Sequence, residues 1–291
     1  MKDWERLSES RKDMSQYVMH CTRPRLKPER AGFVAPYDVL KEILADGFLR
    51  AGFAVHQSPW AYRPKPLVRG PYPAVCFTEQ PLQFFIQSVE ATSRVRYTRF
   101  AVAVRKDDLF HYGGRPVIYD REGILGRRTN DPASPPEAWA YKAGLPRDQQ
   151  YRWVGYDPTV LWDRGDPLDW THEREWRARP NAVLNGQIGL LAVGDVAVPL
   201  LIPTGRTLEG SDLRLIILVE TLQQESDLRQ WIEGNRSTIA ARGSYWRLYS
   251  EALAQVPILS FEFIKSVLDA SNNDLGRLED FYPLSHVPAT R

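Results

Sequence analysis

The chain has 291 residues, of which 43% are hydrophobic and 11% aromatic, and a formal net charge of +2. A chain of this length and apolar content can bury a full core, so the composition excludes an intrinsically disordered protein. The small net charge excludes nucleic-acid binding that depends on bulk electrostatics alone. Cys21 and Cys76 are the only cysteines, which excludes a disulfide framework and a cysteine-rich zinc site.

Common targeting and nucleotide-binding patterns do not occur in the sequence. No apolar run approaches the length of a membrane span, and residues 1–15 lack the apolar segment of a secretory signal. GxGxxG, P-loop and GxSxG patterns are missing, and the five histidines show no HExxH spacing. The sequence therefore predicts a cytoplasmic protein that has no contact with a membrane and no catalytic metal.

The first half of the chain contains four β-prone runs and two helical patterns. They cover residues 17–22, 73–78, 99–104 and 115–119 for the strands, and 37–45 and 79–91 for the helices. Gly47 follows the first helical pattern at the position of a C-terminal glycine. The proline-rich residues 52–72 predict a long ordered loop, and residues 121–150, rich in Arg, Pro and Asp, predict an insertion.

The second half predicts a hairpin, one very hydrophobic strand, two helices and a polar tail. The hairpin covers residues 189–202, with its turn at Gly194-Asp195, and the strand covers 213–219. The helices cover 226–233 and 246–254, and the tail begins at residue 271. Strands that do not alternate regularly with helices favour an α+β fold over a doubly wound parallel sheet. We expect a core over residues 1–222, followed by a C-terminal helical extension and tail over 223–291.

The charged segment at residues 173–177, Glu-Arg-Glu-Trp-Arg, is the most informative stretch. In a strand, Glu173, Glu175 and Arg177 share one face. Two carboxylates beside a guanidinium suit the binding of a polar ligand and the polarisation of a hydroxyl. The alternative is an edge strand with a charged solvent face. A helix is disfavoured because residues two apart do not share a helix face.

Three β-prone segments carry the polar groups from which a site can be built. They are His20-Cys-Thr22, Cys76-Phe-Thr-Glu79 and Glu173-Arg-Glu-Trp-Arg177. A His-x-Thr on one strand, a hydroxyl or aromatic position on a second and a glutamate on a third resemble the three-part site of the ADP-ribosyltransferase superfamily.

Further short strings resemble the AbiGi-type family of abortive phage infection proteins. Together with the three segments above, they run from about residue 17 to residue 220. The strings are Leu40-Lys-Glu-Ile-Leu-Ala-Asp-Gly47-Phe48, Val75-Cys-Phe-Thr-Glu-Gln-Pro-Leu82, Phe100-Ala-Val-Ala-Val-Arg-Lys106 and Gly114-Arg-Pro-Val-Ile-Tyr119.

The resemblance implies an ADP-ribosyltransferase-like split sheet, mixed or antiparallel, with flanking helices. It implies a phage-defence effector that cleaves NAD, as its substrate, and transfers ADP-ribose to a protein, to DNA or RNA, or to water. A second interpretation is a non-catalytic antitoxin or sensor with the same fold that binds a partner protein encoded by a neighbouring defence gene. A third is a metal-dependent nuclease that uses paired carboxylates.

The resemblance also implies roles for the charged groups of the third segment. Glu175 is expected to stabilise the positive charge that develops on the ribose when the bond to nicotinamide breaks. Glu173 is expected to position or deprotonate an acceptor. Arg177 either contacts a phosphate or pairs with one of the glutamates.

The remaining groups are expected to bind NAD. His20 is assigned to the adenosine ribose and Thr22 to the nicotinamide ribose or amide, while Thr78 supplies the hydroxyl of the second strand. Either Tyr119 or Tyr112 stacks on nicotinamide. The simpler alternatives are a structural role for the histidine and small buried hydrophobic roles for both cysteines.

Overall fold

A computed structural model of the chain has a seven-stranded sheet at its centre. It describes residues 15–26, 32–53, 55–56, 65–91, 97–121, 145–161, 167–168, 171, 174–190, 193–194, 196–203, 213–271 and 277–281. The strand order is β17-β16-β8-β1-β7-β14-β9. The strands are β1 (Tyr17–Cys21), β7 (Val75–Thr78), β8 (Ala101–Arg105), β9 (Arg115–Pro116), β14 (Glu175–Ala178), β16 (Leu215–Val219) and β17 (Ile258–Ser260).

The sheet is mixed, because β16 and β17 are parallel while the other neighbouring strands are antiparallel. This arrangement agrees with the predicted α+β class. The predicted strands at 17–22, 73–78, 99–104 and 213–219 are confirmed. Residues 54 and 57–64 of the predicted loop and 122–144 of the predicted insertion lie outside the described residues.

Short two-stranded ribbons surround the central sheet. They pair β2 (Arg25–Leu26) with β3 (Phe33–Val34), β4 (Phe48–Arg50) with β15 (Ala197–Pro199), β5 (Val55–His56) with β6 (Lys65–Pro66), β10 (Ile118–Asp120) with β11 (Trp153–Gly155), and β12 (Asp157–Leu161) with β13 (Pro167–Leu168). The 3-10 helix η3 (Arg147–Arg152) leads directly into β11.

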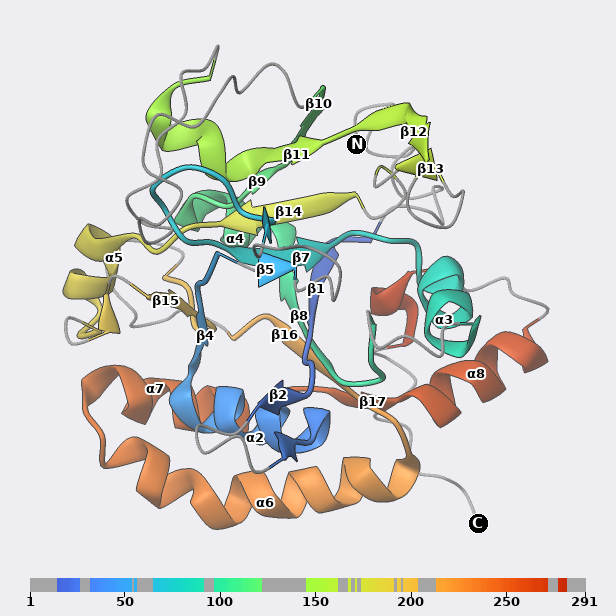
Figure 1. The fold of residues 1–291 in the computed structure, drawn as a ribbon. Coiled ribbons are helices and arrows are strands. Elements are labelled where there is room, and N and C mark those ends of the chain that lie inside the picture. Colours follow the sequence, from blue (N-terminus) through green and yellow to red (C-terminus); the bar gives the residue numbers. More distant parts are fainter. Residues whose placement is uncertain are drawn as a thin grey trace, which may run out of the picture.

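Helices pack on both faces of the sheet. One face is covered by α2 (Pro36–Asp46), α6 (Leu222–Ala240) and α7 (Ser244–Leu253), which Figure 1 shows grouped together. The other face is covered by α3 (Leu82–Ala91) and α8 (Phe261–Ala270), while α4 (Lys106–Tyr112) and α5 (Ala182–Gln187) lie at the ends of strands. None of the helices within the described part of the chain is both long and apolar enough to cross a membrane.

Alternation along β8 divides the interior into two cores. Val102 and Val104 belong to the larger core under α2, α6 and α7. Ala101 and Ala103 belong to the smaller core under α3 and α8. Side chains of a strand point alternately to opposite faces, so one hydrophobic run on a central strand supplies both cores.

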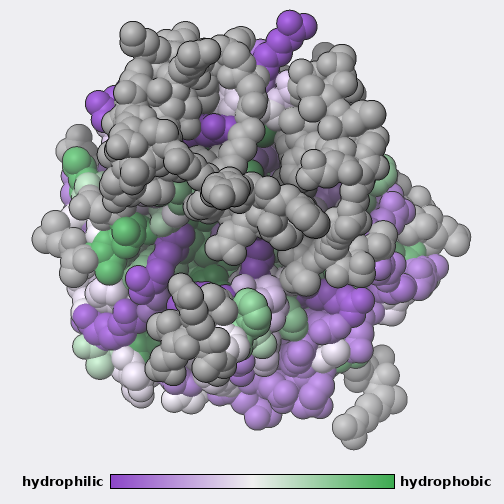
Figure 2. Space-filling view, viewed as in Figure 1, coloured by the Kyte–Doolittle hydropathy of each residue, from purple (hydrophilic) through white to green (hydrophobic). Residues whose placement is uncertain are grey.

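Local signals explain where α2 and α6 begin and end. Pro36 occupies the first turn of α2, and Gly47 closes the helix with a φ of 76°, as the sequence predicted. A capping box between Thr221 and Gln224 starts α6. This helix runs well beyond the predicted residues 226–233. Figure 2 shows mostly hydrophilic surface where Figure 1 places α6, which is consistent with a helix that buries only one side.

The predicted hairpin at residues 189–202 is wrong. Strand β15 pairs with β4 instead of with residues 189–193. The side chain of Asn185 on α5 explains the difference, because its Nδ2 donates to the carbonyls of Gly194 at 2.9 Å and Ala197 at 2.7 Å. These bonds attach Gly194 and Ala197 to α5 and direct Ala197 toward β4.

The last part of the chain contributes more to the fold than its sequence indicated. Strand β17 is an edge strand of the central sheet, and α6 and α7 share the larger core with β1 and β8. The sheet and its core therefore continue past residue 222. Within the predicted polar tail, Leu278 and Phe281 are buried under α3 and α8.

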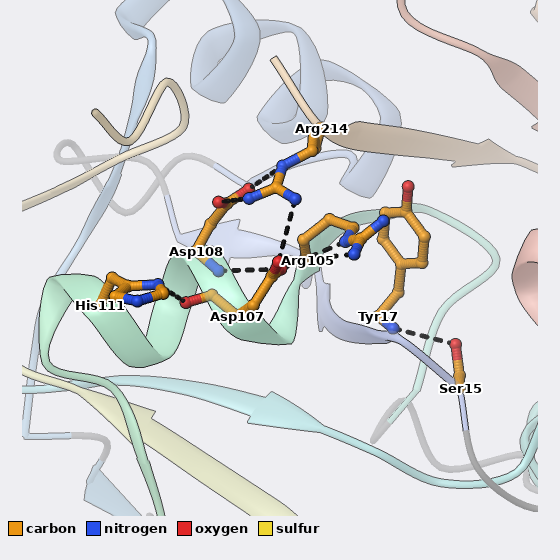
Figure 3. A network of polar contacts seen from close by, with 7 residues as sticks. All are labelled: Ser15, Tyr17, Arg105, Asp107, Asp108, His111 and Arg214. Atoms are coloured by element: carbon orange, nitrogen blue, oxygen red, sulfur yellow. Dashed lines mark hydrogen bonds and ion pairs between the residues drawn. The ribbon is translucent and has the colours of Figure 1, made fainter. Parts of the chain in front are cut away.

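A network of charged side chains ties α4 to strand β16, and Figure 3 shows it from close by. Arg214 forms a two-pronged ion pair with Asp108, and its Nη1 also donates to Asp107 Oδ2 at 2.9 Å. Arg105 Nε donates to the same Asp107 at 3.1 Å. The side chain of Asp108 is 8% exposed, so Arg214 compensates a carboxylate that has lost most of its hydration.

Replacing Arg214 by Met is expected to destabilise the protein by about 3 kcal/mol, because it leaves the buried Asp108 carboxylate without its counter-charge. Urea unfolding followed by circular dichroism measures the change. Arg236→Met is the control, since Arg236 pairs with Glu233 on an exposed part of α6 and should change stability by no more than about 0.5 kcal/mol. Equal effects of the two substitutions would contradict the role assigned to Arg214.

Candidate functional site

The three polar segments singled out in the sequence form neighbouring strands. Strand β7 lies between β1 and β14. Thr78 at the end of β7 is the register partner of Met19 on one side and of Glu175 on the other. Because neighbouring strands lie about 4.8 Å apart, segments separated by more than 150 residues meet within one short stretch of the sheet.

The polar side chains of these strands divide between two faces. Phe77 and Ala178 belong to the larger core. Alternation therefore places Thr78, Glu175 and Arg177 on the opposite face of β7 and β14. The shared face of Glu175 and Arg177 agrees with the strand pattern predicted for residues 173–177, while Glu173 itself lies outside the described residues.

Glu175 and Arg177 form a bidentate ion pair along β14. Arg177 Nε donates to Glu175 Oε1 at 2.7 Å, and Nη2 donates to Oε2 at 3.3 Å. Arg177 Nη1 donates to the backbone carbonyls of Tyr151 at 2.7 Å and Trp153 at 3.2 Å. The guanidinium thus connects β14 to η3 and β11, and its partner carboxylate has a fixed orientation.

Both partners of this ion pair are largely buried. The Arg177 side chain is 3% exposed and that of Glu175 is 12% exposed. Burial alone would lower the pKa of Arg177, but the negative charge of Glu175 and the hydrogen bond to it outweigh burial and raise the pKa above its ordinary value. Of the two roles left open for Arg177, the geometry shows the pairing with a glutamate. A small part of the Glu175 side chain remains exposed to solvent.

Cys76 lies beside this pair as the register partner of Arg177. Burial, followed by the negative charge of Glu175, raises the pKa of the thiol from 9.0 to about 12. A thiol that stays protonated at neutral pH is a poor nucleophile.

His20 lies on β1, the strand next to β7, and its side chain faces away from Glu175. Its ring makes an edge contact with Phe77 of the larger core, with centroids 5.9 Å apart. Nδ1 lies 2.8 Å from the carbonyl oxygen of Cys76. A carbonyl only accepts, so Nδ1 carries the proton. Burial lowers the pKa of His20, with Arg23 adding to the effect and the bond to Cys76 opposing it, which favours the neutral imidazole.

Thr22, just after β1, is hydrogen-bonded to the start of α2. Its side chain is buried, and Oγ1 donates to the carbonyl of Pro36 at 2.9 Å. Its own carbonyl accepts a hydrogen bond from Thr98 Oγ1 at 2.5 Å. These contacts give Thr22 a structural role, and the geometry lends no support to its assignment as a ribose ligand.

Thr78 and Tyr119 lie close to Glu175. Thr78 Oγ1 accepts from the Gln80 amide at 3.1 Å, and Tyr119 Oη accepts from the Glu175 amide at 3.1 Å. Tyr112, the other tyrosine considered for stacking, is buried elsewhere and hydrogen-bonds Asn185 at 2.9 Å. Of the two tyrosines, only Tyr119 contacts the residue expected to be catalytic.

Sequence reasoning missed the contact that holds the ends of β7 and β14 together. The predicted helical pattern 79–91 begins at Glu79, but α3 starts at Leu82. The Glu79 carboxylate instead accepts from Lys106 Nζ at 2.8 Å and from Trp176 Nε1 at 2.7 Å. The pairing of a carboxylate with the indole of the distant Trp176 has no local sequence signal.

Sequence reasoning also missed the pocket at the far end of β14. It has a volume of about 380 Å³, and its lining includes Arg115, Tyr151 and Arg179. Arg179 follows Arg177 by two residues, and this period-2 spacing was the signal that could have identified it.

Within the described residues, no three His, Cys, Asp or Glu side chains gather closely enough to hold a metal ion. Comparisons of the chain with protein-family models, with curated proteins and with solved structures give no match.

Alkylation of Cys76 tests the electrostatics around Glu175. A pKa of about 12 instead of 9.0 reduces the thiolate population at pH 8 roughly a thousandfold. In a Cys21→Ala background, iodoacetamide should therefore modify Cys76 at least about a hundredfold more slowly than free cysteine. Mass spectrometry under native conditions measures the rate.

Adding Glu175→Gln to that background removes a negative charge that raises the thiol pKa, so the reaction should become faster. Native Cys76 that reacts as fast as free cysteine would contradict the described environment. So would a Glu175→Gln substitution that leaves the rate unchanged.

Proposed function

We propose that the chain is an NAD-cleaving enzyme of ADP-ribosyltransferase type in which Glu175 is the catalytic carboxylate. One observation carries the proposal: Glu175 is a fixed, partly exposed carboxylate on the strand next to Thr78, with Tyr119 bonded to its amide. A carboxylate held in place by Arg177 loses little energy to reorganisation when positive charge develops beside it.

The proposed reaction breaks the bond between C1′ of the nicotinamide ribose and the ring nitrogen. Nicotinamide leaves with the bonding electron pair, and the ribose acquires positive charge that Glu175 stabilises. An acceptor oxygen or nitrogen then forms a new bond to C1′ and loses its proton to solvent. With water as the acceptor, the products are ADP-ribose, nicotinamide and a proton.

The described side chains fit parts of this reaction. The hydroxyl of Tyr119 is bonded to the Glu175 amide, and in the proposed reaction its ring stacks on nicotinamide. Thr22 and His20 do not face the carboxylate, and Arg177 already has its bonds to Glu175 and two carbonyls. The proposal therefore keeps Glu175, Thr78 and Tyr119 around the reacting sugar.

The biological role we propose is that of an effector in phage defence, following the resemblance to the AbiGi-type abortive infection family. Cleavage of NAD or modification of a protein or nucleic acid would both halt an infected cell. A protein partner encoded nearby would then restrain or trigger the enzyme.

A specific observation also favours a second candidate function. Both oxygens of Glu175 accept hydrogen bonds from Arg177. A carboxylate engaged in this way suits a non-catalytic antitoxin or sensor, in which the ion pair only stabilises the sheet. Such a module would bind a partner protein instead of NAD.

Nicotinamide release distinguishes the two candidates. Purified chain is incubated with NAD, with and without cell lysate as a source of acceptors, and nicotinamide is quantified by chromatography. Glu175→Gln should reduce release by about a hundredfold or more, because it removes the negative charge that stabilises the developing cation. Glu42→Gln is the matched control, since Glu42 pairs with Arg25 on an exposed surface.

Glu175→Asp separates a catalytic effect from loss of the fold. It retains the negative charge that compensates Arg177, but its shorter side chain moves the carboxylate away from the sugar. It should melt near the temperature of the wild type and still release nicotinamide more slowly. Absence of release by the wild-type chain under all these conditions contradicts the enzyme and favours the binding module.

A further inference from the structure

A pocket at the far end of β14 is lined by positively charged and polar side chains. Its volume of about 380 Å³ lies within the range of small-molecule sites. The side chains that matter here are Arg115 from β9, Arg179 just after β14, Tyr151 from η3 and Gln149 beside it.

The two pocket arginines have no carboxylate partner among the described residues. Arg115 donates to the backbone carbonyls of Phe110 at 2.6 Å and Gly114 at 2.7 Å. Its guanidinium also lies 3.8 Å from the centroid of the Phe110 ring. Arg179 lies over the ring of Tyr72 at 4.8 Å. Backbone dipoles and ring faces position both groups, but neither removes their charge.

Like charges are also aligned across the strands. Arg115 is the register partner of Arg177, and like charges directly opposite one another destabilise a sheet. Glu175 neutralises Arg177, whereas no described acid pairs with Arg115 or Arg179. The end of the sheet therefore has an excess of positive charge that an anion would relieve.

Tyr151 adds a hydrogen-bonding group to the same pocket. Its side chain is 3% exposed, and its hydroxyl has no hydrogen-bond partner within the described part of the chain. Burial raises the pKa of Tyr151, while Arg152, Arg179 and Arg115 act to lower it. Three guanidinium groups therefore lie within electrostatic reach of one buried phenol. The nearby acid is Asp148, which accepts from Gln149 Nε2 at 3.0 Å.

We infer that this pocket binds the diphosphate group of a small molecule, held by Arg115 and Arg179 and by the hydroxyl of Tyr151. Planar guanidinium groups bind phosphate oxygens in pairs, and a phenol donates to a third. The pocket is concave and small, which suits a soluble metabolite. The inference does not depend on catalysis by Glu175, which lies at the other end of β14.

Isothermal titration of the full chain with inorganic pyrophosphate, at fixed ionic strength, tests this assignment. We expect saturable binding with one site per chain. Arg115→Gln and Arg179→Gln should each weaken it by about tenfold or more, because each removes a charge-assisted contact. Tyr151→Phe should weaken it by several-fold without changing the charge of the pocket. Arg236→Gln, on the exposed side of α6, should leave it unchanged.

Further arms identify the source of the diphosphate and the chemistry of recognition. ADP that binds more tightly than pyrophosphate, and loses affinity in the same variants, supports a nucleotide as the natural ligand. Arg115→Lys retains the charge but not the paired donors, so it should bind more weakly than wild type and more tightly than Arg115→Gln. Thermal melting confirms that each variant is folded.

Three results would overturn the inference. The first is no saturable binding of pyrophosphate or ADP at millimolar concentration. The second is equal binding of citrate, which would indicate unselective attraction of anions. The third is an equal loss of affinity in Arg236→Gln and in the pocket variants.

Discussion

The ion pair between Glu175 and Arg177 is the interaction on which the candidate site depends. Arg177 is 3% exposed and reaches the carbonyls of Tyr151 and Trp153 as well as the carboxylate. A buried guanidinium without a counter-charge costs several kcal/mol, so removing the Glu175 carboxylate would leave Arg177 uncompensated. The same bonds connect the central sheet to the segment that carries η3 and β11. One pair of side chains therefore fixes both the orientation of the candidate catalytic carboxylate and the position of the neighbouring η3–β11 segment.

The two faces of β14 have different physical roles. Trp176 and Ala178 pack against the larger core, and the indole of Trp176 also donates to Glu79. Glu175 and Arg177 lie on the opposite face, where the charge pattern continues to Arg179 and its pocket. Apolar burial on one face holds the strand in register, which keeps the charged row on the other face in place. Fixed charges of this kind are suited to binding a polar ligand, because they do not have to reorganise when it arrives.

The sequence predicted the strands and helices that have strong local signals, and it missed those that depend on distant partners. The alternating and continuous apolar runs of β1, β7, β8 and β16 were sufficient, as were Gly47 and the apolar spacing of α2. The hairpin at 189–202 failed because the side chain of Asn185 captures two carbonyls of that segment. In the site, the shared face of Glu175 and Arg177 followed from strand periodicity alone. The opposite orientation of His20 did not, since it depends on which face of β1 packs against the larger core.

The most direct measurement of the central claim is a crystal structure of the chain with bound ADP-ribose. The account predicts a ribose hydroxyl within hydrogen-bonding distance of the Glu175 carboxylate, with the Glu175–Arg177 pair still formed and the Tyr119 ring beside the sugar. A structure in which ADP-ribose binds away from Glu175, while protein atoms close off that carboxylate completely, would contradict it.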